Sequence, residues 1–332
     1  MENIKNKLIY YNRTLSDRLS GLLENGGELR WLFDFVKNHK ELDFQVGRNN
    51  SKEWISVYRG LTRIISISLS GTSMINIVAA DKYKNIATDF YGKKDIKYNF
   101  HNELELLIEK IEADSQFDRY FKNKKEGFYQ NELSRKFGIC GSAADEFVII
   151  DKESVVGYLN QTEKAKSFGT IQQKYKQLQK DISKDNSARY GIDLGKKAIG
   201  NELDFLALDK KGNILLIEYK HGTNTSGIYL STLQIGMYYD IFTNYPRKEL
   251  ECAVFEMLAQ KQKIGLINPE WPKPDRIENI IPVLMISEFN YKSSAKIKFE
   301  EILQFVRNLY GPDFLNNLHT FNYTLKEGLK NW

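Results

Sequence analysis

Residues 201–220 read Asn201-Glu-Leu-Asp-Phe-Leu-Ala-Leu208, then Asp209-Lys-Lys-Gly212, then Asn213-Ile-Leu-Leu-Ile-Glu-Tyr-Lys220. The first and last runs are apolar and of strand length. The polar segment between them holds residues typical of a hairpin turn. The pattern therefore predicts two antiparallel strands, at 201–208 and 213–220. The fold of the second half of the chain is predicted from this hairpin and the segments on either side of it.

The segments on either side of the hairpin predict a mixed β-sheet covered by helices. Apolar residues recur at helical spacing before and after it, and a second buried-type strand follows. The order helix, three strands, helix, strand is typical of an α/β domain. The predicted elements are a helix at 163–182, a strand at 188–194, the hairpin, helices at 227–242 and 248–262, a strand at 281–287, and helices from Phe299 and from Pro312.

The first part of the chain has a different pattern, which predicts an α+β domain. Helical spacing at 4–22 and 28–39 is followed by three β-rich runs, at 54–58, 63–69 and 74–78, that suggest an antiparallel meander. Helical spacing returns near 104–111, and the polar segment 122–141 suggests a boundary. We predict two domains, 1–140 and 141–332. The first carries no chemical motif, and we interpret it as a recognition or oligomerisation domain for a substrate or a protein partner.

Composition excludes several classes of protein. The 332 residues include 48 Lys and Arg against 43 Asp and Glu, a formal charge of +5. We expect no membrane span, no secretory signal, no disulfide scaffold and no Cys- or His-rich metal site, so a cytoplasmic protein is the default. Residues 164–197 hold nine bases and three acids, or +6. A phosphate backbone would favour this segment, although such a run is also typical of a solvated helix face.

Three charged residues of the hairpin indicate chemistry. Side chains alternate along a strand, so Glu218 and Lys220 share one face, and antiparallel pairing brings Asp204 close to Glu218. Two carboxylates side by side repel each other, and a divalent cation removes that conflict. Mg²⁺ binds oxygen and keeps several waters, so Asp204, Glu218 and the backbone carbonyl of Tyr219 suit it. Lys220 could then orient or deprotonate a water and offset negative charge.

These residues resemble the Asp…(Asp/Glu)-x-Lys core of the PD-(D/E)XK nucleases. Asp204 is followed by Glu218-Tyr-Lys220, and Gln234-Ile-Gly-Met-Tyr238 resembles the Gln-x-x-x-Tyr element of one branch of that superfamily. The resemblance covers roughly 160–290. It implies a restriction-endonuclease-like fold and a phosphodiesterase that acts mostly on DNA with Mg²⁺ or Mn²⁺. Asp204 and Glu218 would be metal ligands, Lys220 the base or electrostatic partner, and Gln234 and Tyr238 phosphate or base contacts.

One departure from the family pattern concerns the helix before the sheet, where many members carry a Glu. The stretch 168–179 holds no acid. Glu163 precedes that helix, and Gln172 or Gln173 could substitute. Glu202 shares a strand face with Asp204 and could add a ligand. The sequence leaves open which of these residues completes a metal site.

Several alternatives remain open at the level of sequence. Asp204, Glu218 and Lys220 could form a structural ion cluster, and Tyr238 could be a core residue. The leading hypothesis is a nuclease for DNA, with RNA not excluded, that acts in restriction or phage defence. The second is a non-catalytic nucleic-acid-binding module, and the third is an interaction subunit that works through residues 1–140. A homodimer fits the first hypothesis, but the sequence identifies no interface.

Overall fold

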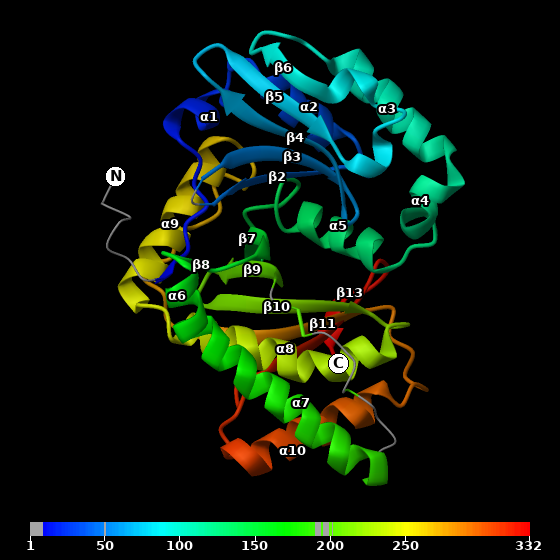
Figure 1. The fold of residues 1–332 in the computed structure, drawn as a ribbon, viewed down its shortest axis with the longest axis vertical. Helices are drawn as coiled ribbons and strands as arrows, with labels where there is room; N and C mark the ends of the chain where they lie inside the picture. Colours follow the sequence, from blue (N-terminus) through cyan, green and yellow to red (C-terminus); the bar gives the residue numbers. More distant parts are fainter. Residues whose placement is uncertain (1–8, 50, 190–193, 195–198, 201) are drawn as a thin grey trace. The chain divides into compact units, whose positions relative to one another are not determined.

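The computed structural model describes residues 9–49, 51–189, 194, 199–200 and 202–332 (Figure 1). The chain divides into two compact units, each built from separate stretches. Unit 1 comprises Met1–Tyr11, Asp151–Cys252 and Pro274–Trp332, and unit 2 comprises Asn12–Ile150 and Ala253–Lys273. Each unit combines a β-sheet with helices, which confirms the predicted α/β class.

A six-stranded mixed sheet forms the centre of unit 1, in the order β13-β12-β11-β10-β9-β7. Strands β9 and β10 are antiparallel, as predicted, whereas β11 lies parallel to both β10 and β12. The strands are β7 (Phe147–Ser154), β9 (Leu203–Asp209), β10 (Ile214–His221), β11 (Ile280–Ser287), β12 (His319–Thr324) and β13 (Gly328–Asn331). The chain passes from unit 2 to unit 1 within β7.

Helices cover the sheet of unit 1 in two layers. Helix α8 (Thr225–Thr243) packs on β10 and β11, and α7 (Thr170–Arg189) and α10 (Ala295–Tyr310) pack on α8. Ile228 and Ile235 of α8 meet Leu284 and Ile286 of β11 in one apolar core. The remaining elements are β1 (Ile9–Tyr10), β8 (Gly157–Tyr158), α6 (Gln161–Lys164), the π-helical turn η4 (Ala165–Gly169) and α9 (Arg247–Lys263), in which the chain returns to unit 2.

Unit 2 is built on a five-stranded antiparallel sheet in sequence order, which confirms the predicted meander and extends it by one strand at each end. Its strands are β2 (Asp43–Arg48), β3 (Glu53–Arg59), β4 (Thr62–Ser70), β5 (Met74–Ala79) and β6 (Tyr91–Asp95). Buried apolar residues of the sheet and of several helices around it pack together in one core. The helices are α1 (Asp17–Gly21), α2 (Arg30–Asn38), η2 (Asp81–Tyr83), η3 (Thr88–Phe90), α3 (His101–Ala113), α4 (Ser115–Lys122) and α5 (Glu126–Lys136).

The predicted helix at 4–22 is wrong over much of its described length. Strand β1 pairs with β8, and a helix is present only at α1. Tyr11 is fixed by two distant partners: its backbone N–H donates to the Tyr245 hydroxyl at 2.6 Å, and its hydroxyl donates to Asp151 Oδ2 at 2.7 Å. These tertiary hydrogen bonds override the helical spacing. Residues 4–8 of that prediction lie outside the described residues.

The predicted helix from Pro312 is also wrong, because the chain continues as β12 and β13. Strand β12 pairs in parallel with β11, from Val283 with His319 to Ser287 with Tyr323. The stretch His-Thr-Phe-Asn-Tyr-Thr is rich in residues that favour strands. Of the predicted strand at 188–194, positions 188 and 189 belong to α7, and 190–193 lie outside the described residues.

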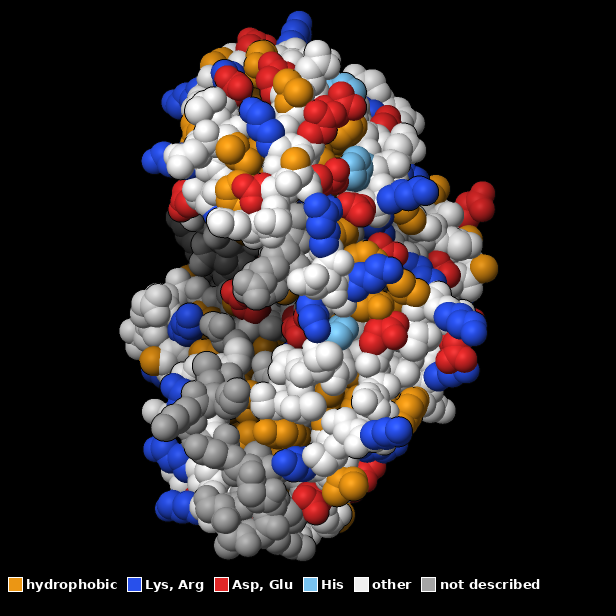
Figure 2. Space-filling view, turned by 90° about the vertical axis from the view of Figure 1, so that its right-hand side faces the viewer, with side chains coloured by type: hydrophobic (Ala, Val, Ile, Leu, Met, Phe, Trp, Pro, Cys, Tyr) orange, Lys and Arg blue, Asp and Glu red, His pale blue; other side chains and the backbone are white. Residues whose placement is uncertain are grey.

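The helices of the described ranges include none that is both long enough and apolar enough to span a bilayer. On the face of the molecule drawn in Figure 2, basic, acidic and hydrophobic side chains are intermingled. Side chains of one charge sign therefore form no single continuous area on that face, although the whole sequence has a formal charge of +5.

Candidate active site

The open end of the β9–β10 hairpin brings Asp204, Glu218 and Lys220 together, as predicted. The strand pairing runs from Ile214 with Leu208 to Ile217 with Phe205, so Asp204 lies beside the end of β10. The backbone N–H of Tyr219 donates to Asp204 Oδ2 at 2.7 Å. This bond fixes the Asp204 side chain over β10 rather than leaving it free in solvent.

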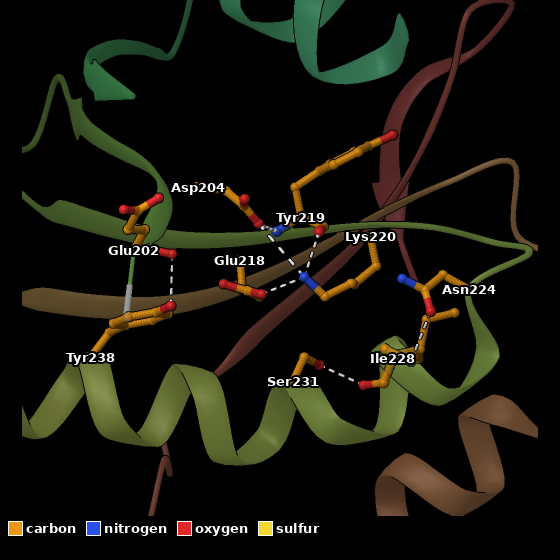
Figure 3. A network of polar contacts seen from close by, with 10 residues as sticks. Glu202, Asp204, Glu218, Tyr219, Lys220, Asn224, Ile228, Ser231 and Tyr238 are labelled. Carbon is orange, nitrogen blue, oxygen red and sulfur yellow. Dashed lines mark hydrogen bonds and ion pairs between the residues drawn. The ribbon is translucent and has the colours of Figure 1, made fainter. Parts of the chain in front are cut away.

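The Lys220 ammonium lies at the centre of the group (Figure 3). Its Nζ donates to the Tyr219 carbonyl at 2.9 Å and forms a close ion pair with Glu218 Oε1. Asp204 Oδ2 is 3.7 Å from the same nitrogen. The three oxygens predicted to hold a metal thus surround one cationic nitrogen, and Glu218 and Lys220 share one strand face.

Exposure increases from one side of this group to the other. Glu218 is 2% exposed and Lys220 is 7% exposed, whereas the Asp204 side chain is 21% exposed. Two carboxylates and one ammonium carry a net charge of −1 when all are ionised. A divalent cation that reached the group from the Asp204 side would stabilise both carboxylates in their charged form.

Helix α8 begins where β10 ends and carries the other predicted residues. The Asn224 side chain caps the helix by accepting from the Gly227 backbone N–H at 3.0 Å. The Tyr238 hydroxyl donates to the backbone carbonyl of Glu202 at 2.7 Å. A Cβ built on Gly200 would lie 3.3 Å from Gln234 Nε2 and 3.5 Å from the Tyr238 hydroxyl. Gln234 and Tyr238 therefore share one helix face and point toward the start of β9.

The Tyr238 hydroxyl forms a structural hydrogen bond and lies near several carboxylates. Burial and the nearby carboxylates of Glu218, Asp204 and Glu202 raise the pKa of the Tyr238 hydroxyl. The side chain is 2% exposed. Tyr238 is a core residue of α8 that holds Glu202 and the strand start in place, which agrees with the structural alternative drawn from the sequence.

Ser287 is a residue of this region that the sequence did not single out. The Tyr219 hydroxyl and Ser287 Oγ are hydrogen bonded, and both residues are fully buried. Ser287 ends an otherwise apolar strand, which is the sequence signal that could have identified it. This bond links β10 to β11 on the face opposite Lys220. His221 also lies apart from the charged group, with Nδ1 2.8 Å from Thr223 Oγ1.

The donor set fits a hard divalent cation with few protein ligands. Within the described ranges, no cluster of three or more His, Cys, Asp and Glu side chains is placed to hold a metal. Asp204, Glu218 and the Tyr219 carbonyl supply only oxygen, which suits Mg²⁺ or Mn²⁺ completed by waters and a phosphate. Glu202 is exposed two residues from Asp204, whereas Glu163 pairs with Lys166 at 3.1 Å.

The basic segment 164–197 is divided between structural and exposed lysines. Lys174 lies on α7 and pairs with Asp240 of α8 at 2.8 Å, so it joins the two helices. Lys176, Lys180 and Lys184 are exposed at intervals of four residues and so share one helical face. Lys196 and Lys197 lie outside the described residues.

Comparisons with known proteins give no match: no family model, no curated protein and no solved structure is significantly similar to this chain. The functional argument therefore rests on the residues and geometry described above.

Proposed function

We propose that unit 1 is a Mg²⁺- or Mn²⁺-dependent nuclease that hydrolyses phosphodiester bonds, with DNA as its substrate. The observation that supports this most is the arrangement of Asp204 Oδ2, Glu218 Oε1 and the Tyr219 carbonyl around one cationic position. The resemblance of Asp204, Glu218 and Lys220 to the PD-(D/E)XK core gives the same substrate class. Restriction or phage defence would be the biological setting.

The chain's own residues have distinct parts in this proposal. Asp204, Glu218 and the Tyr219 carbonyl would hold the ion. When bound, a divalent ion stabilises negative charge on phosphate oxygens and makes a bound water more acidic. The Tyr219 N–H keeps Asp204 oriented toward Lys220. With the carboxylates holding an ion, the Lys220 ammonium would hold a water or offset charge that develops on the phosphate.

Substrate contacts would come from the helices next to the sheet. The Gln234 amide can donate to a phosphate oxygen or contact a base. The exposed lysines Lys176, Lys180 and Lys184 provide positive charge on α7 that a phosphate backbone favours. Binding through these lysines should weaken as salt concentration rises. Salt dependence of binding is therefore a property of this proposal that can be measured separately from cleavage.

The test is a cleavage assay on linear, nicked, single-stranded and supercoiled DNA and on RNA, with Mg²⁺, with Mn²⁺ and with chelator. Asp204→Asn keeps an acceptor for the Tyr219 N–H but removes the charge, and should lower the rate by about a hundredfold or more. The matched control is Asp209→Asn, which lies on the same strand and also accepts a backbone N–H at 2.7 Å. It should leave cleavage intact. Cleavage that needs no divalent ion, or that survives Asp204→Asn, contradicts the proposal.

A second candidate is a nucleic-acid-binding module without catalysis. The observation that favours it is that Lys220 already contacts both Glu218 and the Tyr219 carbonyl, as it would in a structural ion cluster. This candidate predicts salt-sensitive DNA binding that persists in chelator and in the Asp204→Asn variant. It also predicts no hydrolysis with either metal. The cleavage assay above therefore separates the two candidates.

A further inference from the structure

Unit 2 contains a cavity that has no part in the nuclease proposal. It lies among the β3–β4 turn, η2, and helices α3, α4 and α5, and has a volume of about 290 Å³. This volume is at the lower end of the range for small-molecule sites. The residues that matter most for its chemistry are Arg59, Lys82, Tyr83, Phe117, Phe121 and Lys125.

Two glycines that face each other form one wall of the cavity. Gly60 has a positive φ of 63°, and a Cβ built on it would lie 3.2 Å from the Gly127 carbonyl oxygen. A Cβ on Gly127 would in turn lie 3.2 Å from the Leu61 backbone nitrogen. The Gly60 N–H also donates to the Asn131 side chain at 3.3 Å. This close backbone contact fixes the β3–β4 turn against α5, so backbone atoms form this wall of the cavity.

The rest of the lining combines aromatic rings with cations. The Arg59 guanidinium lies 4.1 Å from the centre of the Phe121 ring, and Lys82 Nζ lies 4.8 Å from that of Tyr83. Arg59 is paired with Glu41 and Glu112, so Lys82 and Lys125 stand against one acid of the lining, Glu126, with a net charge of +1. An aromatic and positively charged cavity is complementary to a flat ring that carries a negative group.

Lys82 is the cation best placed to receive that negative group. Its Nζ donates to Thr62 Oγ1 at 2.9 Å, a bond that directs the amine toward the β4 side of the cavity. Lys82 is an exposed residue, but partial burial of its amine at the cavity lowers its pKa, so the charged form is incompletely solvated. Such an ammonium gains more from an anion than a fully hydrated one does. Arg59, by contrast, is held by ion pairs to Glu41 and Glu112.

We propose that this cavity binds a small aromatic anion, with its ring against Phe117, Phe121 and Tyr83 and its negative group at Lys82 and Lys125. An aryl carboxylate and a nucleoside monophosphate share this chemistry, and both are tested. The proposal goes beyond the nuclease assignment and does not depend on it, because every residue it uses belongs to unit 2.

The experiment measures binding to the full chain by calorimetry with five probes. They are benzoate, adenosine monophosphate, benzyl alcohol, benzylammonium and inorganic phosphate. Saturable binding of benzoate or of adenosine monophosphate, with at least tenfold weaker binding of the other three, is the expected result. The first two probes distinguish an aryl acid from a nucleotide. If neither aromatic anion saturates, or if phosphate or benzyl alcohol binds equally well, the proposal is wrong.

Variants test whether the observed binding takes place in this cavity. Lys82→Met should weaken binding of the preferred anion about tenfold, because it removes a charge-assisted contact. Lys84→Met is the matched control: it removes an exposed lysine two residues away that does not line the cavity, and it should bind like the unmodified protein. Leu61→Glu changes a lining residue that is 49% exposed. It should also weaken binding, and because the position is exposed it should not impair folding. Unchanged affinity in both Lys82→Met and Leu61→Glu overturns the proposal.

Discussion

The two ends of the β9–β10 hairpin use acidic side chains in different ways. At the turn, Asp209 Oδ1 accepts from the backbone N–H groups of Lys211 and Asn213, and its Oδ2 accepts from the Asn213 side chain. At the open end, Asp204 and Glu218 share one ammonium, that of Lys220. The first acid is satisfied by its own turn, whereas the two acids of the second pair depend on the same ammonium.

This difference shows how a structural acid and a candidate catalytic acid can be told apart on one pair of strands. Both Asp204 and Asp209 accept a backbone N–H at 2.7 Å, so that hydrogen bond alone does not distinguish them. What distinguishes them is their neighbours. Asp209 completes a local network, whereas Asp204 adds charge beside a buried Glu218. A substitution at the turn should therefore lower stability but not activity, whereas Asp204→Asn should lower activity but not stability.

The largest effect is expected from removal of the central cation. Lys220→Met leaves Glu218 buried without its ion pair and should lower the free energy of unfolding by about 3–5 kcal/mol. Urea unfolding measures this. The double variant Glu218→Gln/Lys220→Met should recover most of the loss, because the buried charge is removed with its partner. A loss of similar size in the double variant would show that packing, not charge, is the cause.

At the turn end, the largest effect is expected at Gly212. Its φ is +86°, and a Cβ there would lie 2.2 Å from the Arg276 carbonyl oxygen. Gly212→Ala should therefore lower the free energy of unfolding by about 1–3 kcal/mol. Thermal unfolding and cleavage assays together check this, since activity per folded molecule should be unchanged. A loss of activity in the folded variant would break the distinction between the two ends.

Asp209→Asn should be the less stable of the two hairpin variants, whereas Asp204→Asn should be the less active. Asp209→Asn puts an amide opposite the Asn213 amide and should cost about 1 kcal/mol. Asp204→Asn keeps the acceptor for Tyr219 and removes repulsion from Glu218, so its stability should be equal or higher. Urea unfolding of the two variants side by side gives the comparison. A larger loss for Asp204→Asn than for Asp209→Asn would indicate a structural ion cluster.

A similarly small effect on stability is expected at Tyr238. Tyr238→Phe removes one hydrogen bond to the Glu202 carbonyl and should cost about 1 kcal/mol at neutral pH. Because the pKa of the folded Tyr238 is raised, its contribution is complete below the unfolded value of about 10 and is lost as pH rises above it. The unfolding free energy of the Phe variant should therefore fall less steeply above that pH. Parallel slopes for both proteins would contradict the raised pKa.

Local pattern was sufficient to predict the elements whose apolar periodicity and turn residues agree. The hairpin, helices α8, α9 and α10, strand β11 and the meander of unit 2 are confirmed. The convergence of Asp204, Glu218 and Lys220 followed from strand alternation and hairpin pairing alone. Their catalytic role and the metal remain predictions.

Long-range contacts explain what the sequence did not predict. Tyr11 lies outside any helix because it is held by Asp151 and Tyr245, which are far along the chain. The residues of β12 favour strands, but the pairing of β12 with β11 is a long-range contact that local pattern does not reveal. Helix α5 was not predicted because most of its buried residues are polar. Asn131, Ser134 and Arg135 are hydrogen bonded to distant groups, so the segment 122–141 has little apolar periodicity.

The most direct test of the metal proposal is anomalous diffraction from crystals soaked in Mn²⁺, with Asp204→Asn crystals as the control. The account predicts a peak bound by Asp204, Glu218 and the Tyr219 carbonyl, with the Lys220 ammonium displaced from at least one of those oxygens, and a weaker peak in the control. No peak there, with Lys220 still in contact with Glu218 and the Tyr219 carbonyl at saturating Mn²⁺, would contradict it.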